Sequence, residues 1–148
     1  MGLRYNYLGR TGIKVSELGF GALTIGPLQT NLPLDEGAAI LGHALKRGIN
    51  FVDTAKLYET YGYILRACGA GADTVVSSKS YAYTYEGVKE DVGEALEALQ
   101  RKYIDIFSLH EQTSRLTLHG HKEALRYLAD AKSQGLIRAV GVSTHAVE

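Results

Sequence analysis

Short apolar segments alternate with helical patterns along the whole chain of 148 residues. We predict strands over 18–23, 50–54, 74–79, 104–109 and 137–143. We predict helices from an N-cap at Asp35 to Gly48, and over 60–68, 85–101 and 119–134, from their apolar spacing and flanking glycines. Regular alternation of this kind is typical of an open doubly wound sheet or of a (β/α)8 barrel.

The length of the chain decides how much of a barrel it can form. A complete (β/α)8 barrel needs about 250 residues, so this chain would supply only the first half or slightly more. Ahead of the first strand, residues 4–16 read as a β-hairpin, because two alternating runs flank the turn Gly9-Arg10-Thr11-Gly12. We therefore expect residues 1–148 to form one partial barrel domain with about five parallel strands and four helices, preceded by a hairpin.

Four polar residues stand at or just beyond the ends of three predicted strands: Asp53, Tyr58, Lys79 and His110. Parallel strands joined by helices place all their C-terminal ends on one rim, so these four side chains should meet there. A carboxylate, a phenol, an amine and an imidazole in one place can form an acid–base site. Each residue alone also has an ordinary interpretation, such as a cap for Asp53 or core packing for His110. Their common position favours the joint site.

Charge and cysteine content exclude several classes of function. Sixteen basic and sixteen acidic residues give a formal net charge of zero, which argues against a broad nucleic-acid or anionic-membrane surface. The single cysteine, Cys68, excludes an internal disulfide, a cysteine zinc site and a complete iron–sulfur site. It suits a reducing cytoplasm. We expect no membrane span and no signal peptide, because the chain lacks a long apolar run.

Two weaker patterns carry little functional information. Gly19, Gly21 and Gly26 do not have the spacing of a dinucleotide fingerprint, and no helix is predicted to open there. His119 and His121 stand at a predicted helix start without nearby carboxylates, so we expect no metal site and assign His121 to packing or capping.

Three alternating tyrosines follow Lys79 and leave two interpretations open. Tyr81, Tyr83 and Tyr85 could line a substrate pocket, or they could pack on the surface.

Several motifs, taken in order, resemble the N-terminal half of an aldo-keto reductase. They are Leu8-Gly9-Arg10-Thr11-Gly12, Leu18-Gly19-Phe20-Gly21, Phe51-Val52-Asp53-Thr54-Ala55, Ser78-Lys79, Leu109-His110 and Gly141-Val142-Ser143-Thr144. The segments 109–112, 120–121 and 135–141 resemble a branch of that family whose members often carry a C-terminal iron–sulfur extension. Nothing of that extension is present in this sequence.

The resemblance implies a (β/α)8 barrel plugged at its bottom by the hairpin, and NADP(H)-dependent reduction of a small carbonyl substrate. Tyr58 would be the general acid that protonates the carbonyl oxygen. Lys79 would bring down the pKa of Tyr58, and Asp53 would pair with Lys79. His110 would hydrogen-bond the substrate carbonyl, while the hydride comes from the nicotinamide.

The resemblance also assigns part of the cofactor site. Ser143 and Thr144 match the position that binds the nicotinamide carboxamide, although Thr144 departs from the commoner asparagine. The phosphate- and adenine-binding loops of the family lie beyond residue 148, so we expect the chain alone to be inactive. The alternative is a half-barrel without catalysis that serves as a binding or assembly module. Unpaired first and last strands predict self-association, or a C-terminal half that completes the barrel.

Overall fold

A computed structural model describes residues 2–70 and 73–146 of the protein. The strands are β1 (Tyr5–Tyr7), β2 (Lys14–Ser16), β3 (Phe20–Gly21), β4 (Phe51–Asp53), β5 (Val75–Ser80), β6 (Ile104–Leu109) and β7 (Ile137–Val142). The α-helices are α1 (Leu34–Lys46), α2 (Tyr61–Cys68), α3 (Tyr85–Ala98), α4 (Arg115–Gly120) and α5 (Lys122–Ser133). Two 3-10 turns, η1 (Ala22–Ile25) and η2 (Lys56–Tyr58), follow β3 and β4.

The predicted half-barrel is confirmed. Strands β3 to β7 form one sheet in sequence order, and every neighbouring pair is parallel. All positions of β5 and β6 are buried, as expected for central parallel strands covered on both faces. Positions of β7 alternate between buried and more exposed up to Val140, because successive side chains point to opposite faces of the sheet and one face is less covered at this strand.

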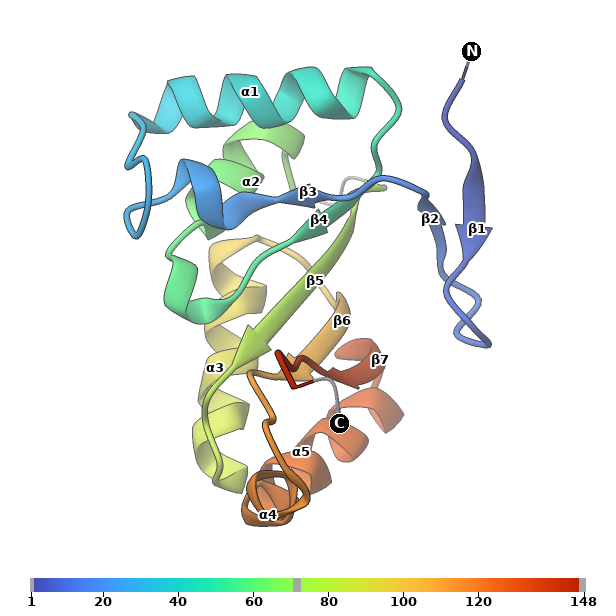
Figure 1. Cartoon of the computed structure of the whole chain (residues 1–148), viewed down its shortest axis with the longest axis vertical. Coiled ribbons are helices and arrows are strands. Elements are labelled where there is room, and N and C mark those ends of the chain that lie inside the picture. Colours follow the sequence, from blue (N-terminus) through green and yellow to red (C-terminus); the bar gives the residue numbers. More distant parts are fainter. Residues whose placement is uncertain (1, 71–72, 147–148) are drawn as a thin grey trace.

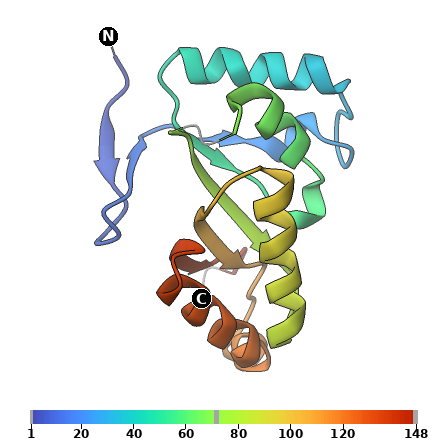
Figure 2. The ribbon, with the colours of Figure 1, turned by 180° about the vertical axis from the view of Figure 1, so that it is seen from behind.

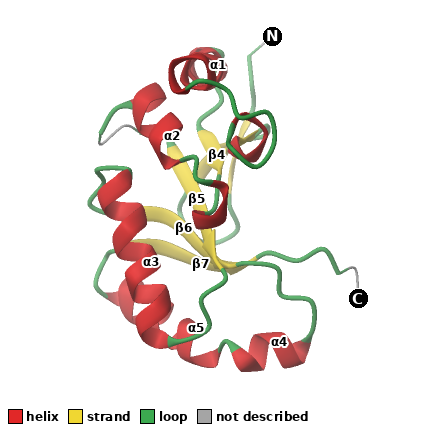
Figure 3. Ribbon diagram, turned by 90° about the vertical axis from the view of Figure 1, so that its left-hand side faces the viewer, coloured by secondary structure: helices red, strands yellow, loops and turns green. Residues whose placement is uncertain are grey.

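Helices α1, α2, α3 and α5 cover one face of the sheet, as Figures 2 and 3 show, whereas α4 lies beside α5 beyond the sheet. The main core lies between this face and the helices. Its fully buried members include Leu41 of α1, Ile64 of α2, Phe107 of β6 and Leu128 of α5. Among the described residues, no helix is long and apolar enough to cross a membrane.

The predicted hairpin, β1 with β2, stands beside the N-terminal ends of the strands (Figure 1). Ile13 and Val15 form a second buried cluster with Val75, Ile106 and Ala139 of the sheet. The hairpin therefore closes the end of the sheet opposite to the rim on which the functional residues were predicted.

The first strand of the parallel sheet, β3, is shorter than predicted. We expected a strand over 18–23, whereas β3 ends at Gly21 and continues as the turn η1. Phe20 pairs with Val52 and Gly21 pairs with Asp53, the last residue of β4. The short partner strand gives β3 nothing further to pair with, so the backbone turns at Ala22, which is buried.

The last predicted helix, over 119–134, is two helices. Ser114 begins α4 with a capping box, in which its side chain and that of Thr117 bind each other's backbone N–H groups. The helix is interrupted at His121, whose backbone leaves helical geometry after the weak helix former Gly120. The Nδ1 atom of His121 lies 2.7 Å from the Thr117 carbonyl oxygen and so closes the first helix.

Two other helix ends differ from the prediction. The N-cap of α1 is Pro33 rather than Asp35, which lies in the first turn, where a carboxylate favours the helix dipole. Helix α3 ends at Ala98 instead of residue 101, because Gln100 has a φ of 50° and cannot continue the helix.

Candidate active site

The four predicted residues lie together at the C-terminal rim of the sheet. Asp53 is the last residue of β4, Lys79 is the fifth residue of β5, and His110 directly follows β6. Tyr58 is the last residue of η2, the turn that follows β4. These side chains come from the C-terminal ends of three successive strands and the segments that follow them, and parallel pairing of the strands brings these ends to one edge.

A charged pair forms the base of the site. The Lys79 ammonium donates hydrogen bonds of 2.7 Å to Asp53 Oδ2 and 2.7 Å to the Thr54 carbonyl oxygen. Lys79 is only 8% exposed, so its charge is held largely away from water by these two oxygen atoms. A buried ammonium needs such partners, because an unpaired one would be strongly disfavoured.

Tyr58 lies above this pair and against the histidine. Its hydroxyl oxygen is 3.3 Å from Nε2 of His110, and the two rings meet edge to face with centroids 5.5 Å apart. The Lys79 Nζ atom is 4.9 Å from the centroid of the Tyr58 ring. The phenol hydroxyl, the imidazole and the ammonium therefore share one small region.

The pKa of Tyr58 is raised above its ordinary value, first by burial and then by the charges of Asp53 and Glu111. This contradicts the expectation that Lys79 lowers it. The positive charge of Lys79 is already bound by Asp53, so little of it acts on the phenol, while burial disfavours the phenolate. Tyr58 consequently keeps its proton at neutral pH and is suited to donate it.

His110 is neutral near neutral pH. Burial lowers its pKa, and the positive charge of Lys79 lowers it further. Its backbone N–H donates to the Ser80 carbonyl oxygen, which fixes it beside β5. Within the described part of the chain, its buried Nδ1 atom has no hydrogen-bond partner. A neutral imidazole can accept or donate a hydrogen bond through Nε2, depending on its tautomer.

Of the three alternating tyrosines, one lines the site and two lie outside it. Tyr81 stacks on His110 with ring centroids 4.2 Å apart, and therefore forms a wall of the site. Burial and a hydrogen bond to Glu111 raise the pKa of Tyr81 to about 12. Tyr83 is exposed, and Tyr85 donates to Asp130 in a packing contact with α5.

Ser143 and Thr144 follow β7 on the same rim. The Ser143 hydroxyl accepts a hydrogen bond from the Glu111 backbone N–H. The backbone N–H of Ser143 donates to the Leu109 carbonyl oxygen. Thr144 is exposed and accepts from the Ala146 backbone N–H. Ser143 is thus tied to the loop that carries His110.

Sequence reasoning found no phosphate-binding pattern at Gly26 but missed its structural role, which is to let two loops approach each other closely. A Cβ atom added to Gly26 would lie 2.4 Å from Thr60 Cγ2 and 2.9 Å from the Tyr58 carbonyl oxygen. Glycine is therefore required for the turn after β3 to pack on the turn that carries Tyr58. A second support is the 2.6 Å hydrogen bond between the buried hydroxyls of Thr54 and Thr60.

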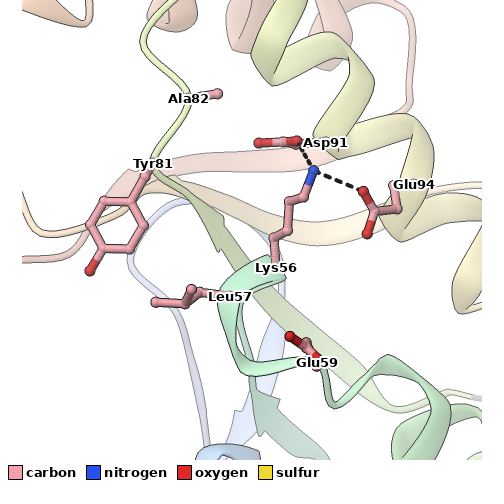
Figure 4. Close-up of a pocket in the computed structure, with 7 residues that line it drawn as sticks. All are labelled: Lys56, Leu57, Glu59, Tyr81, Ala82, Asp91 and Glu94. Carbon is pink, nitrogen blue, oxygen red and sulfur yellow. Dashed lines mark hydrogen bonds and ion pairs between the residues drawn. The ribbon is translucent and has the colours of Figure 1, made fainter. Parts of the chain in front are cut away.

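A pocket opens next to the site, between η2 and α3 (Figure 4). Its lining joins apolar and charged side chains: Lys56, Leu57, Glu59, Tyr81, Ala82, Asp91 and Glu94. Tyr81 therefore separates this pocket from His110. Across residues 2–70 and 73–146, no cluster of three or more histidine, cysteine or acidic side chains could hold a metal ion.

Comparison with known proteins agrees with this geometry. The model of the aldo/keto reductase family matches residues 17–148. L-galactose dehydrogenase from Arabidopsis thaliana is 30% identical over 92% of this chain and 47% of its own length. Aldo-keto reductase YhdN from Bacillus subtilis is 28% identical over 99% of this chain and 48% of its own length. The chain thus spans about half the length of the curated relatives it matches.

Solved structures show the same relationship. The aldo-keto reductase AKR11C1 from Bacillus halodurans, in its holo form, superposes with a TM-score of 0.81 at 26% identity. The match covers 97% of this chain and 51% of that one.

Proposed function

Since the chain belongs to the aldo/keto reductase family, we propose that the protein takes part in NADP(H)-dependent reduction of small aldehydes or ketones. The observation that carries this proposal is the position of the Tyr58 hydroxyl, 3.3 Å from His110 Nε2 and beside the Lys79–Asp53 pair. Carbonyl reduction requires a hydride and a proton, and this arrangement offers a proton donor beside a neutral hydrogen-bonding imidazole and a held ammonium.

Tyr58 is the proton donor in this proposal. When bound, the reduced nicotinamide supplies the hydride that adds to the carbonyl carbon. The electrons of the carbonyl double bond move to its oxygen, and Tyr58 gives that oxygen its proton. The raised pKa of Tyr58 keeps this proton in place until the oxygen becomes basic.

His110 and Lys79 assist from either side of the phenol. His110 is neutral, so its Nε2 can hydrogen-bond the substrate oxygen without charging the site. The Lys79 ammonium lies 4.9 Å from the Tyr58 ring centroid, and the part of its charge that Asp53 does not compensate favours the phenolate that remains after proton transfer. Asp53 holds Lys79 in place.

Ser143 and Thr144 have chemistry that fits the nicotinamide carboxamide. Each hydroxyl oxygen already accepts a backbone N–H, which leaves its own O–H to donate to a carbonyl oxygen. In this proposal the two residues hold the nicotinamide end of the cofactor at the rim. Residues outside this sequence would hold the adenine end and its phosphate, so we expect the 148-residue chain alone to bind NADPH weakly and to turn over little substrate.

The test is Tyr58→Phe in the protein as its gene encodes it. We expect kcat for an unactivated aldehyde to fall about 100-fold or more, because the proton donor is lost. Affinity for NADPH, followed by fluorescence titration, should change little. Tyr103→Phe removes a hydroxyl from a half-exposed ring that packs on Arg138 and serves as the control. Equal rates for Tyr58→Phe and wild type would remove Tyr58 from this role.

A further inference from the structure

A buried carboxylate on α3 lies behind the turn that carries Tyr58. Lys56 opens this turn, two residues before Tyr58, and its ammonium binds Asp91 and Glu94 of α3. Figure 4 shows the Lys56 side chain extending from the turn towards both carboxylates. The mechanism proposed above does not use any of these three side chains.

The second carboxylate oxygen of Asp91 reaches the strand that carries Lys79. It accepts a hydrogen bond from the hydroxyl of Ser80, which directly follows Lys79 in β5. The carbonyl oxygen of Ser80 accepts the backbone N–H of His110 at 2.9 Å. One carboxylate thus connects the turn of Tyr58 with the backbone that positions both Lys79 and His110.

Burial distinguishes Asp91 from the other acidic partner of Lys56. The Asp91 side chain is 11% exposed, whereas the Glu94 side chain is 54% exposed. Ion pairs at exposed positions contribute little, but a charge-assisted hydrogen bond away from water is stronger and fixes geometry. The bond to Asp91 is also the main reason that the pKa of Lys56 is raised, so Lys56 remains charged.

The turn itself has little regular structure to hold it. It is a single 3-10 turn of three residues, and Glu59 ends it with a φ of 56°, which an L-residue rarely adopts. Such a conformation persists only when contacts around it hold it. Thr54 and Thr60 hold its base, and the Lys56–Asp91 pair holds its first residue.

We propose that Asp91 is a positioning residue, which sets the distance of Tyr58 from His110 and Lys79 without touching the substrate. The geometric part of this proposal rests on the contacts described above. The expected effect of Asp91 on turnover rests on the proposed function. The carboxylate acts by binding Lys56 with one oxygen and Ser80 with the other.

The first test is kinetic and uses the protein as its gene encodes it. Asp91→Asn keeps the shape of the side chain and removes its charge. We expect kcat for aldehyde reduction to fall roughly 10- to 100-fold, because small misplacement of a reacting group is costly, with KM changed by less than about twofold. Glu94→Gln removes the exposed partner of Lys56 and should leave kcat within about twofold. In a Tyr58→Phe background, Asp91→Asn should produce no further loss, since it acts through Tyr58.

The second test observes Tyr58 directly and needs no turnover. In protein labelled with 13C-tyrosine, the signal that disappears in Tyr58→Phe is that of Tyr58. We expect this signal to shift or broaden in Asp91→Asn, and to stay unchanged in Glu94→Gln. The signal of Tyr103 should stay unchanged in every variant. Lys56→Met removes the other partner of this contact at a partly exposed position, and should produce the same change in the Tyr58 signal. It is the variant to use if Asp91→Asn folds poorly.

The outcomes separate the two proposals. An unmoved Tyr58 signal in both Asp91→Asn and Lys56→Met overturns the positioning role. Equal loss from Asp91→Asn with and without the Tyr58 hydroxyl overturns it as well, because the effect would then not pass through Tyr58. A displaced Tyr58 signal in a protein that shows no carbonyl reduction supports the positioning role and counts against the proposed function.

Discussion

The hydroxyl of Tyr58 lies 3.3 Å from Nε2 of His110, although 52 residues separate them in the chain. Two opposite pKa changes accompany this contact. The phenol is harder to deprotonate than a free tyrosine, and the imidazole is harder to protonate than a free histidine. Burial is the main cause of both, because it disfavours the charged form of each group. At neutral pH the contact is therefore between two neutral groups.

This relationship predicts the pH dependence of the proposed reduction. Reduction needs a protonated phenol, and a raised pKa keeps Tyr58 protonated beyond pH 10, the ordinary value for tyrosine. We expect kcat for reduction to be level through neutrality and to fall only on the far alkaline side. The measurement is a pH–rate profile in the range where the fold is intact. A fall centred below about pH 9, and absent in Tyr58→Phe, would contradict the raised pKa.

The Lys79–Asp53 pair predicts a stability change. Asp53→Asn removes the charge that binds a mostly buried ammonium, so the free energy of unfolding should fall by about 1–3 kcal/mol. Lys79→Met added to Asp53→Asn removes the ammonium that has lost its counter-charge, and should recover part of this loss. Urea denaturation of the single and double variants measures both values. Additive losses in the double variant would show that the two side chains do not depend on each other.

Replacing Gly26 or Gly42 by alanine gives a matched pair of variants with opposite expected effects on stability. A methyl group at Gly26 would overlap Thr60 and the Tyr58 carbonyl, so Gly26→Ala should destabilise the protein by about 1–3 kcal/mol. Gly42 lies in α1 with open space around its missing Cβ, so Gly42→Ala should stabilise by about 0.5–1 kcal/mol through helix propensity. Thermal and urea denaturation would test the opposite signs. A neutral Gly26→Ala would mean that the Tyr58 turn can move aside without cost.

The exposed valines of β7 test the predicted self-association. Strand β7 lies at one end of the sheet, and Val140 and Val142 are exposed there. Because an unpaired edge with apolar side chains favours pairing with another chain, we propose that isolated chains associate through β7 and β3. Val142→Lys should reduce the mean mass found by light scattering.

The control for this experiment is Leu116→Lys on α4. Leu116 is 83% exposed and lies on a helix instead of a strand edge, so its replacement should leave association unchanged. A compact monomer at high concentration of wild-type chain would refute the proposal.

Some features of the fold were predictable because they depend on local pattern. The strand predicted over 104–109 has the bounds of β6, since an unbroken apolar-rich run between two helical patterns suits a strand buried on both faces. The strand β5 differs from its prediction by one residue at each end. The meeting of Asp53, Lys79 and His110 followed from the same argument, because parallel strands share one C-terminal rim.

Features that depend on neighbours distant in sequence were not predictable in this way. The end of β3 was set by the length of β4, the strand with which it pairs. Whether Tyr81 lines the site depended on its stacking against His110. Neither of these contacts leaves a signal in the spacing of residues along the chain. The division between α4 and α5 is different, because the Ser114 cap and the contact of His121 with Thr117 are local and the prediction missed them.

The amino-acid sequence by itself determined the alternating fold, the strand order and the rim on which the polar residues meet. Hydrophobic periodicity and chain connectivity are sufficient for that, because both act through local segments. Only the tertiary structure decided the protonation of Tyr58, since burial and the binding of Lys79 by Asp53 outweigh the lysine charge. It also placed Asp91 behind the turn of Tyr58, because that contact requires α3 to pack beside a loop 35 residues earlier.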